Sequence, residues 1–196
     1  MEFEFERALN RVMVWGARIF IAAMLGSGVA CSGSSAPLGA VPAAPAGTCD
    51  SVQSFPSLGQ AHIQAGDAHP PYNSNPPTSG WHWDTPQHEG VFTTQQVQEQ
   101  ILHNLEHGFV NVQYKDLNGP EVQRLTDLAR RDQHHLILAP YPGLPADVKV
   151  AMTAWTGPNG DLVRQVGKLQ YCKGLDENAV RAFISAYRDK GPELVP

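Results

Sequence analysis

Residues 31–48 are the segment that most constrains what this chain can fold into. After Cys31 they are almost entirely Ser, Gly, Ala, Pro and Val. Such a run buries too little apolar surface to offset the entropy that is lost on ordering, so we expect a flexible tether. The folded part is then confined to residues 49–196, which have the size of a single globular domain.

Residues 1–30 have the features of an export signal. Arg18 precedes an apolar stretch over residues 19–25, and small residues follow. A basic flank, a short apolar core and small residues before a cleavage point are typical of exported proteins. The apolar stretch is shorter than the roughly 20 residues that a membrane span needs. We therefore predict an exported protein, translated from Met1 or, because the first residues are a poor signal start, from Met13.

Cys31 directly follows Val29 and Ala30, an arrangement similar to the bacterial motif in which that cysteine carries a lipid. A lipid on Cys31 would anchor the domain to a membrane of the cell envelope. The alternative is ordinary cleavage after Ala30, with Gly28 and Ala30 as the small pair. Both interpretations place the protein outside the cytoplasm.

Cys49 and Cys172 stand near the two ends of the expected domain. In an oxidising compartment such a pair is expected to be bonded. Closing a loop of this length would stabilise the fold by on the order of 4–5 kcal/mol on the chain-entropy model. The alternative is that one of the two sulfurs is a soft metal ligand.

The charge of the chain argues against a nucleic-acid partner. The net charge is −5, and Lys and Arg do not gather into a stripe. A nucleic-acid-binding domain is expected to carry a basic patch or stripe.

The domain begins with turn-forming residues, and periodic segments follow. Residues 49–92 are rich in Pro, Gly, His and Asn, which predicts long loops with at most short strands. A helix is expected to begin at Thr93, which with Gln96 has the spacing of a capping box, and to end at Gly108 in the left-handed conformation.

Strand and helix signals then alternate to the end of the chain. We expect strands at residues 109–114, 136–139, 148–155 and 162–166. Further helices are expected from Pro120 and over residues 175–190. The first strand, helix and strand of this series fit a crossover that joins parallel strands. The sequence thus predicts an α+β fold, with a small mixed sheet packed by about three helices and a long loop-rich N-terminal part.

Two histidines at the end of the first expected helix carry the strongest functional signal. His103 and His107 project from one helix face about one turn apart, a separation at which both can bind one metal ion. They lie away from the apolar stripe of Val97, Ile101 and Leu105. The pair therefore faces either water or a polar pocket that another segment covers.

The segment of residues 72–82 is the candidate cover. Pro76 and Pro77 restrict its backbone, and Gly80 allows a sharp reversal just before His82. A loop with so little freedom can hold a histidine as a preorganised ligand.

These residues favour an extracytoplasmic metal-binding protein that stores or delivers an ion. His82, His103 and His107 would supply imidazoles, with His62 or Met152 as a fourth ligand. Copper is the first choice, because imidazoles bind it strongly and a thioether suits its reduced state, and zinc is next. Binding requires neutral imidazoles, so the affinity should fall as the pH drops through roughly 6.5.

Three alternatives stay open, and with them the question whether the protein is an enzyme. The histidine pair could simply be solvated. His103-x-x-Glu106-His107 has the spacing of inverse zinc proteases, which suggests a zinc-dependent hydrolase with Glu106 as general base. Finally, the loop of residues 76–80 could bind an envelope partner without metal. The other histidines are weaker candidates or expected surface and packing residues: His69, His88, His134 and His135.

Several motifs together resemble one bacterial family. Residues 76–82 read Pro-Pro-Thr-Ser-Gly-Trp-His, and residues 103–108 read His-Asn-Leu-Glu-His-Gly. With Gly90, residues 153–155 and residues 191–193, they resemble the family catalogued as domain of unknown function 3105. The resemblance covers about residues 49–193 and implies an exported or membrane-tethered protein, and it assigns no catalytic role to any residue. The residues that it picks out are His82, His103, Glu106 and His107.

Overall fold

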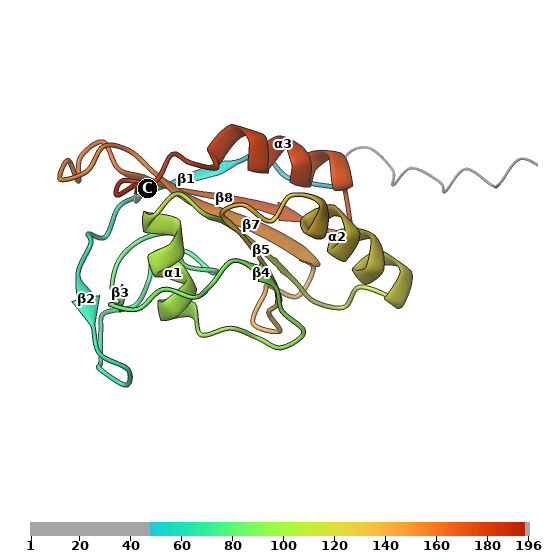
Figure 1. The fold of residues 1–196 in the computed structure, drawn as a ribbon, viewed down its shortest axis with the longest axis horizontal. Coiled ribbons are helices and arrows are strands. Elements are labelled where there is room, and N and C mark those ends of the chain that lie inside the picture. Colours follow the sequence, from blue (N-terminus) through green and yellow to red (C-terminus); the bar gives the residue numbers. More distant parts are fainter. Residues whose placement is uncertain (1–47, 195–196) are drawn as a thin grey trace, which may run out of the picture. The chain divides into compact units, whose positions relative to one another are not determined.

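The computed structural model describes residues 48–194, and a six-stranded mixed sheet forms the centre of this part (Figure 1). The strand order is β1-β8-β7-β5-β6-β4. The strands are β1 (Gln53–Pro56), β4 (Gly90–Val91), β5 (Val110–Tyr114), β6 (Leu136–Pro140), β7 (Val150–Thr156) and β8 (Val166–Cys172). β4 and β5 both run parallel to β6, whereas β7, β8 and β1 follow in antiparallel pairs. The predicted export signal of residues 1–30, Cys31 and nearly all of the tether lie outside the described residues.

Three helices cover the two faces of this sheet, which confirms the predicted α+β fold. The helices are α1 (Gln98–Glu106), α2 (Gly119–Arg131) and α3 (Glu177–Tyr187). On one face, Leu125 of α2 and Phe183 of α3 pack in a core cluster with Val112 and Met152 of the sheet. On the opposite face, Leu102 and Leu105 of α1 pack against Trp155 of β7. Figure 1 shows α2 and α3 on the side of the sheet away from α1.

The N-terminal part is loop-rich, as predicted, and contains one short pairing of its own. β2 (His62–Ile63) and β3 (His82–Trp83) are two-residue strands that run parallel to each other, separate from the main sheet. Their register sets His62 opposite His82. No regular spacing of residues marks these strands, because each is too short to show a period.

Two predicted boundaries differ from the structure. α1 begins at Gln98, not at Thr93, and its N-cap Val97 makes no side-chain cap hydrogen bond. The Gln96 side chain instead donates to the carbonyl of Thr94 and accepts from Gln87 Nε2, so it is used in the loop before the helix. The expected apolar stripe thus loses Val97, which is 41% exposed.

The strand predicted at residues 162–166 is wrong except for its last residue. Asp161 accepts hydrogen bonds from the backbone and side chain of Arg164, which turns the chain there. Leu162 and Val163 are left exposed at this turn, and β8 begins only at Val166. Apolar character alone did not distinguish this turn from a strand. The predicted crossover is confirmed, since β5 and β6 are parallel and α2 connects them.

The predicted disulfide is present and joins Cys49 to Cys172 across 123 residues of sequence. The same two residues form an isolated antiparallel bridge, so the bond attaches the start of the described part to the end of β8. This excludes both sulfurs as free metal ligands. Among residues 48–194, no helix is long and apolar enough to cross a membrane.

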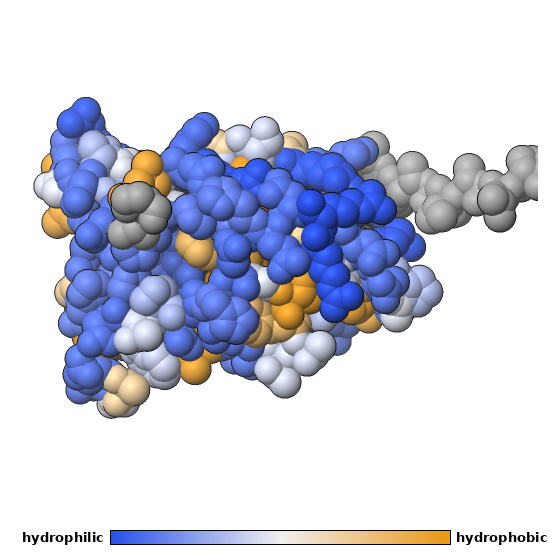
Figure 2. Space-filling model, in the orientation of Figure 1, coloured by the Kyte–Doolittle hydropathy of each residue, from blue (hydrophilic) through white to orange (hydrophobic). Residues whose placement is uncertain are grey.

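The surface is mostly hydrophilic on the face that Figure 2 shows, with smaller apolar areas between the polar side chains. The large hydrophobic side chains that are exposed in the described part are Val97, Leu162, Val163 and Leu194. Most other apolar side chains pack in the clusters on the two faces of the sheet. Many of the buried polar side chains lie instead in the loops and on α1.

Candidate metal centre

Four side chains from three short elements converge beside the N-terminal half of the domain. They are His62 of β2, His82 of β3, and His103 and Glu106 of α1. Each offers one nitrogen or carboxylate oxygen, and these atoms all lie within 4.8 Å of one another. Such a group can hold a metal ion.

The pairing of β2 with β3 brings the first two histidines together. His62 and His82 are direct partners in the parallel register, and the backbone N–H of His82 donates to the carbonyl of Ala61. The two rings meet edge to face with centroids 4.7 Å apart. A main-chain pairing therefore places two imidazoles that are 20 residues apart in sequence on the same side.

α1 supplies the other two members from one face. His103 and Glu106 are three residues apart and so lie on the same side of a helix. Leu102 and Leu105 of the same helix pack on Trp155. The polar side does not face water, because the β3 segment covers it: His103 is 5% exposed and Glu106 is 1% exposed. Of the two expected environments, the covered polar pocket is the one present.

Backbone carbonyls orient the two buried imidazoles. Nδ1 of His82 donates to the carbonyl of Gly80 at 2.7 Å, and Nδ1 of His103 donates to the carbonyl of Trp83 at 2.5 Å. Gly80 has a φ of 115°, a conformation that side chains other than hydrogen rarely allow. With Nδ1 of each ring engaged, Nε2 is the nitrogen that is left to bind an ion. This orientation by a main-chain oxygen is typical of metal-binding histidines.

Two glutamine side chains outside the group hold the Glu106 carboxylate through consecutive hydrogen bonds. Its Oε1 accepts from Gln60 Nε2 at 2.7 Å, and Gln60 Oε1 accepts from Gln165 Nε2 at 2.8 Å. Burial raises the pKa of Glu106, but the adjacent His82 imidazole and the Gln60 amide outweigh it, so the pKa lies below its usual value. A negative charge is therefore enclosed beside the histidines.

One close contact within the group, between Glu106 and His82, lacks the geometry of a hydrogen bond. Glu106 Oε2 lies 3.0 Å from His82 Nε2, a distance that would suit an ion pair. Both atoms are buried, yet neither has a hydrogen-bond partner in the described part of the chain. Two buried polar atoms therefore face each other without a hydrogen bond. A cation bound to both would satisfy them.

His103 is kept in the form that binds metal. Burial lowers its pKa from 6.5 to about 4, the hydrogen bond to Trp83 opposes this in part, and the neighbouring His82 and His107 add to the lowering. The imidazole is therefore neutral at physiological pH, with Nε2 available.

Two of the predicted ligands lie outside the group. His107 stacks on His103 with ring centroids 4.6 Å apart, but its Nδ1 donates to the carbonyl of Glu193 and it is not among the four converging side chains. Met152 is fully buried in the core cluster with α2 and α3, on the face opposite Trp155, and Trp155 is the residue of β7 that meets the His82 ring. The structure therefore brings together His62, His82 and His103, but not Met152.

Three parts of the site were not predicted as such. Glu106 was expected to flank the histidines or act as a base, and the structure places it within the group. Gln60 and Gln165 gave no sequence signal, because glutamines in loops and turns are common and their meeting depends on the fold. The carbonyl of Gly80 had an indirect signal in the stiff proline-rich segment before His82.

A second histidine group, of His134, His135 and Asp189, lies at the surface just after the C-terminal end of α3. His135 Nδ1 lies 2.7 Å from Asp189 Oδ1, and His134 Nε2 lies 3.3 Å from the same oxygen. One carboxylate oxygen can accept from both rings, so this cluster is satisfied without an ion. His69 and His88 each contact a neighbouring backbone carbonyl and lie outside both groups.

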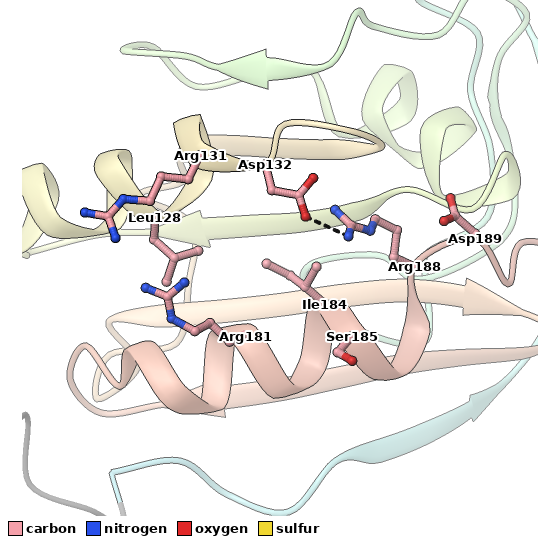
Figure 3. Close-up of a pocket in the computed structure, with 8 residues that line it drawn as sticks. All are labelled: Leu128, Arg131, Asp132, Arg181, Ile184, Ser185, Arg188 and Asp189. Carbon is pink, nitrogen blue, oxygen red and sulfur yellow. Dashed lines mark hydrogen bonds and ion pairs between the residues drawn. The ribbon is translucent and has the colours of Figure 1, made fainter. Parts of the chain in front are cut away.

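A pocket of about 340 Å³ lies between α2 and α3, away from the predicted site residues (Figure 3). Asp132 and Arg188 point toward each other across it, and Arg188 Nη2 donates to Asp132 Oδ2 at 2.7 Å. Leu128 and Ile184 add apolar contacts. Since its charges are of both signs and already paired in part, the pocket indicates no particular ligand.

Comparison with known proteins identifies a family but no activity. A family model described as "Protein of unknown function (DUF3105)" matches residues 62–195. This range contains His62, His82, His103 and Glu106. No curated protein and no solved structure matches the chain.

Proposed function

The chain belongs to the DUF3105 family, and we propose that it is an extracytoplasmic metal-binding protein whose ligands are His62, His82, His103 and Glu106. The observation that carries the proposal is the contact between His82 Nε2 and Glu106 Oε2, two buried atoms 3.0 Å apart without hydrogen bonds. Glu106 Oε2 also lies 3.8 Å from His62 Nε2. Ligands of a tetrahedral ion with bonds of 2.0–2.2 Å lie roughly 3.4 Å apart, between these two distances.

The donor set favours a divalent ion. Three imidazoles and one carboxylate suit Cu(II) and Zn(II), whereas Cu(I) prefers thioether and thiolate ligands. Reduced copper would need a thioether such as Met152, which lies on the other face of the sheet. Cu(II) remains the first choice because it stands highest in the affinity order of the divalent ions, and Zn(II) is next.

The proposed location is the cell envelope, with Cys31 as the lipid attachment point after removal of residues 1–30. The disulfide between Cys49 and Cys172 supports this, since such bonds are typical of oxidising compartments outside the cytoplasm. A tethered domain that holds one ion would store it or deliver it.

The donor set argues for binding rather than hydrolysis. Catalytic zinc sites keep an open position and a free general base, whereas structural and storage sites are closed by four protein ligands. Here Glu106 is itself within the group, so it would be a ligand and not a base. A metal-free module is less favourable for another reason: it would keep Glu106 Oε2 and His82 Nε2 buried without a hydrogen bond.

The test is a metal titration of the exported protein without a polyhistidine tag. We expect one equivalent of Cu(II) or Zn(II) to bind to the wild type, as measured by competition with a chelator of known affinity. His103→Ala and Glu106→Gln should each weaken metal binding by about 100-fold or more. Mutation of residues that only orient the ligands already lowers metal affinity by roughly 10–100-fold, and loss of a ligand should cost at least as much. His107→Ala is the matched control, one helical turn from His103, and should change the affinity by no more than a few-fold.

Two results would contradict the proposal. Wild-type affinity that is only millimolar, or equal affinity in His103→Ala and the wild type, would show that the group does not bind metal. If Glu106→Gln kept its metal but lost a hydrolytic activity of the wild type, Glu106 would be a base, and the hydrolase hypothesis would replace this one.

A further inference from the structure

We infer that His62 is the displaceable ligand of this site, through which the ion passes to and from a second molecule that offers an imidazole or thiolate. The inference rests on the proposed metal site and goes beyond it: it assigns the direction of exchange and the chemistry of the exchange partner. Three independent asymmetries among the four side chains support it.

The first asymmetry is exposure. The side chain of His62 is 49% exposed, whereas those of His82 and Glu106 are 0% and 1% exposed. His103 is also buried. A molecule in solution can therefore approach the centre past His62, while the other three ligands are enclosed by α1, β3 and the core.

The second asymmetry is the support behind each side chain. His82 and His103 each donate Nδ1–H to a backbone carbonyl, and Glu106 accepts from Gln60. Within the described residues, the His62 ring makes no hydrogen bond. Its contacts are the faces and edges of His82 and His103, at centroid distances of 4.7 and 5.0 Å, and Glu106 Oε2 at 3.8 Å. Its rotation costs none of the hydrogen bonds that hold the other ligands.

The third asymmetry is the backbone. β2 is only two residues long and pairs with β3 alone. Gly59 and Gly66 stand on either side of it with φ angles of 96° and 92°, and a Cβ built at either position would meet nothing within 4 Å. The backbone that carries His62 is therefore less enclosed at both ends than the helix and strand backbones that carry the other three ligands.

These asymmetries suit a ligand substitution. The incoming nitrogen or sulfur forms a bond to the ion as the bond from His62 breaks, and the neutral imidazole keeps its lone pair as it leaves. In the exchange of Zn(II), an incoming thiol gives its proton to solvent, and no electron is transferred because Zn(II) has no redox chemistry. The enclosed set of His82, His103 and Glu106 holds the ion during the exchange. A site closed on all sides would release its ion slowly, so an exposed ligand favours delivery over permanent storage.

The experiment measures transfer from Zn(II)-loaded protein to the chromogenic chelator 4-(2-pyridylazo)resorcinol by stopped flow. In the wild type, the transfer rate should rise in proportion to the chelator concentration, because the chelator takes the place of His62. In His62→Ala the position is already open, so transfer at a given chelator concentration should be about tenfold faster. The equilibrium affinity of this variant should fall by only about tenfold, much less than in His103→Ala.

His107→Ala serves as the control and should transfer zinc at the wild-type rate. A wild-type rate that does not depend on chelator concentration, together with no acceleration in His62→Ala, would overturn the inference while leaving the metal site intact. Loss of zinc binding in His62→Ala as complete as in His103→Ala would also overturn it, since His62 would then be an essential ligand. If the wild type binds no zinc or copper at all, the proposed function itself fails.

Discussion

The protonation of His103 illustrates how burial changes the chemistry of a single residue. An isolated imidazole titrates near pH 6.5, which led to the expectation that metal affinity falls below that value. Burial in the covered side of α1 moves the pKa of His103 to about 4. The neutral, metal-binding form of this ligand is therefore available well below the expected threshold, and the earlier expectation does not hold for His103.

This shift predicts how the stability of the metal-free protein depends on pH. The folded state keeps His103 neutral down to about pH 4, whereas the unfolded chain takes up a proton near pH 6.5. Stability is therefore fully present above 6.5 and is lost progressively as the pH falls from 6.5 toward 4. Urea unfolding at a series of pH values, with a chelator present, should show this decline.

The matched variant for the pH prediction is His103→Gln, which removes the titrating group and keeps a polar side chain. Between pH 6.5 and 4, its unfolding free energy should change less with pH than that of the wild type. The difference in slope should correspond to the uptake of up to about one proton fewer on unfolding. Identical slopes for the variant and the wild type would refute the prediction. Glu106, whose pKa is also lowered, contributes in the same direction but only at more acidic pH.

At the scale of elements, the end of α1 is positioned by the last described segment of the chain. The Glu193 backbone N–H donates to the carbonyl of Glu106, and the Asp189 N–H donates to the carbonyl of Gly108. Between these contacts, Gly191 lies so close to α1 that a Cβ there would overlap the backbone of Glu106 and Gly108. The motif over residues 191–193 thus acts on the site by packing against the helix that carries two ligands.

We predict that Gly191→Ala impairs both stability and metal binding. The added methyl group forces α1 and the C-terminal segment apart, which should cost on the order of 2–3 kcal/mol of unfolding free energy. The displacement of Glu106 should weaken metal binding in the same variant. Thermal unfolding and chelator competition measure the two effects.

Gly119→Ala is the control for this prediction, since a Cβ at the start of α2 would meet nothing within 4 Å. It should leave the unfolding free energy within about 0.5 kcal/mol of the wild type and metal affinity unchanged. Equal behaviour of the two variants would contradict the role given to Gly191.

At the scale of the whole molecule, the disulfide closes a loop that contains the sheet, α1, α2 and the proposed site, while α3 follows it. Cys49 and Cys172 are separated by 123 residues, and Cys172 is fully buried at the end of β8. Because the bond restricts the unfolded chain, the described domain depends on oxidising conditions for part of its stability.

Replacing both cysteines by alanine should lower the unfolding free energy by on the order of 4–5 kcal/mol, measured by urea denaturation. Chemically reduced wild type keeps the side-chain volumes and should lose nearly the same amount. A loss confined to the alanine variant would instead indicate a packing effect. Metal affinity of the folded fraction should change little, since neither sulfur is a ligand in the proposed site.

Local pattern was sufficient for most of the fold. Apolar pattern identified α2, α3, β5, β6 and β7 to within a few residues, because the helices bury one regular face and the strands are buried along nearly their whole length. It was not sufficient for the start of α1 or for the turn around Leu162, where side-chain hydrogen bonds overrode apolar character. The two-residue strands β2 and β3 have no period at all.

For the site, the sequence by itself determined which side chains were worth considering. Helical spacing put His103 on the polar side of α1 together with Glu106, and the stiff loop pointed to His82. Only the tertiary structure decided which of the candidates meet. The β2–β3 register aligns His62 with His82, the C-terminal segment engages His107, and strand alternation turns Met152 to the opposite face. The physical reason is that spacing along a helix or strand defines a face, whereas convergence depends on contacts between residues that are far apart in the chain.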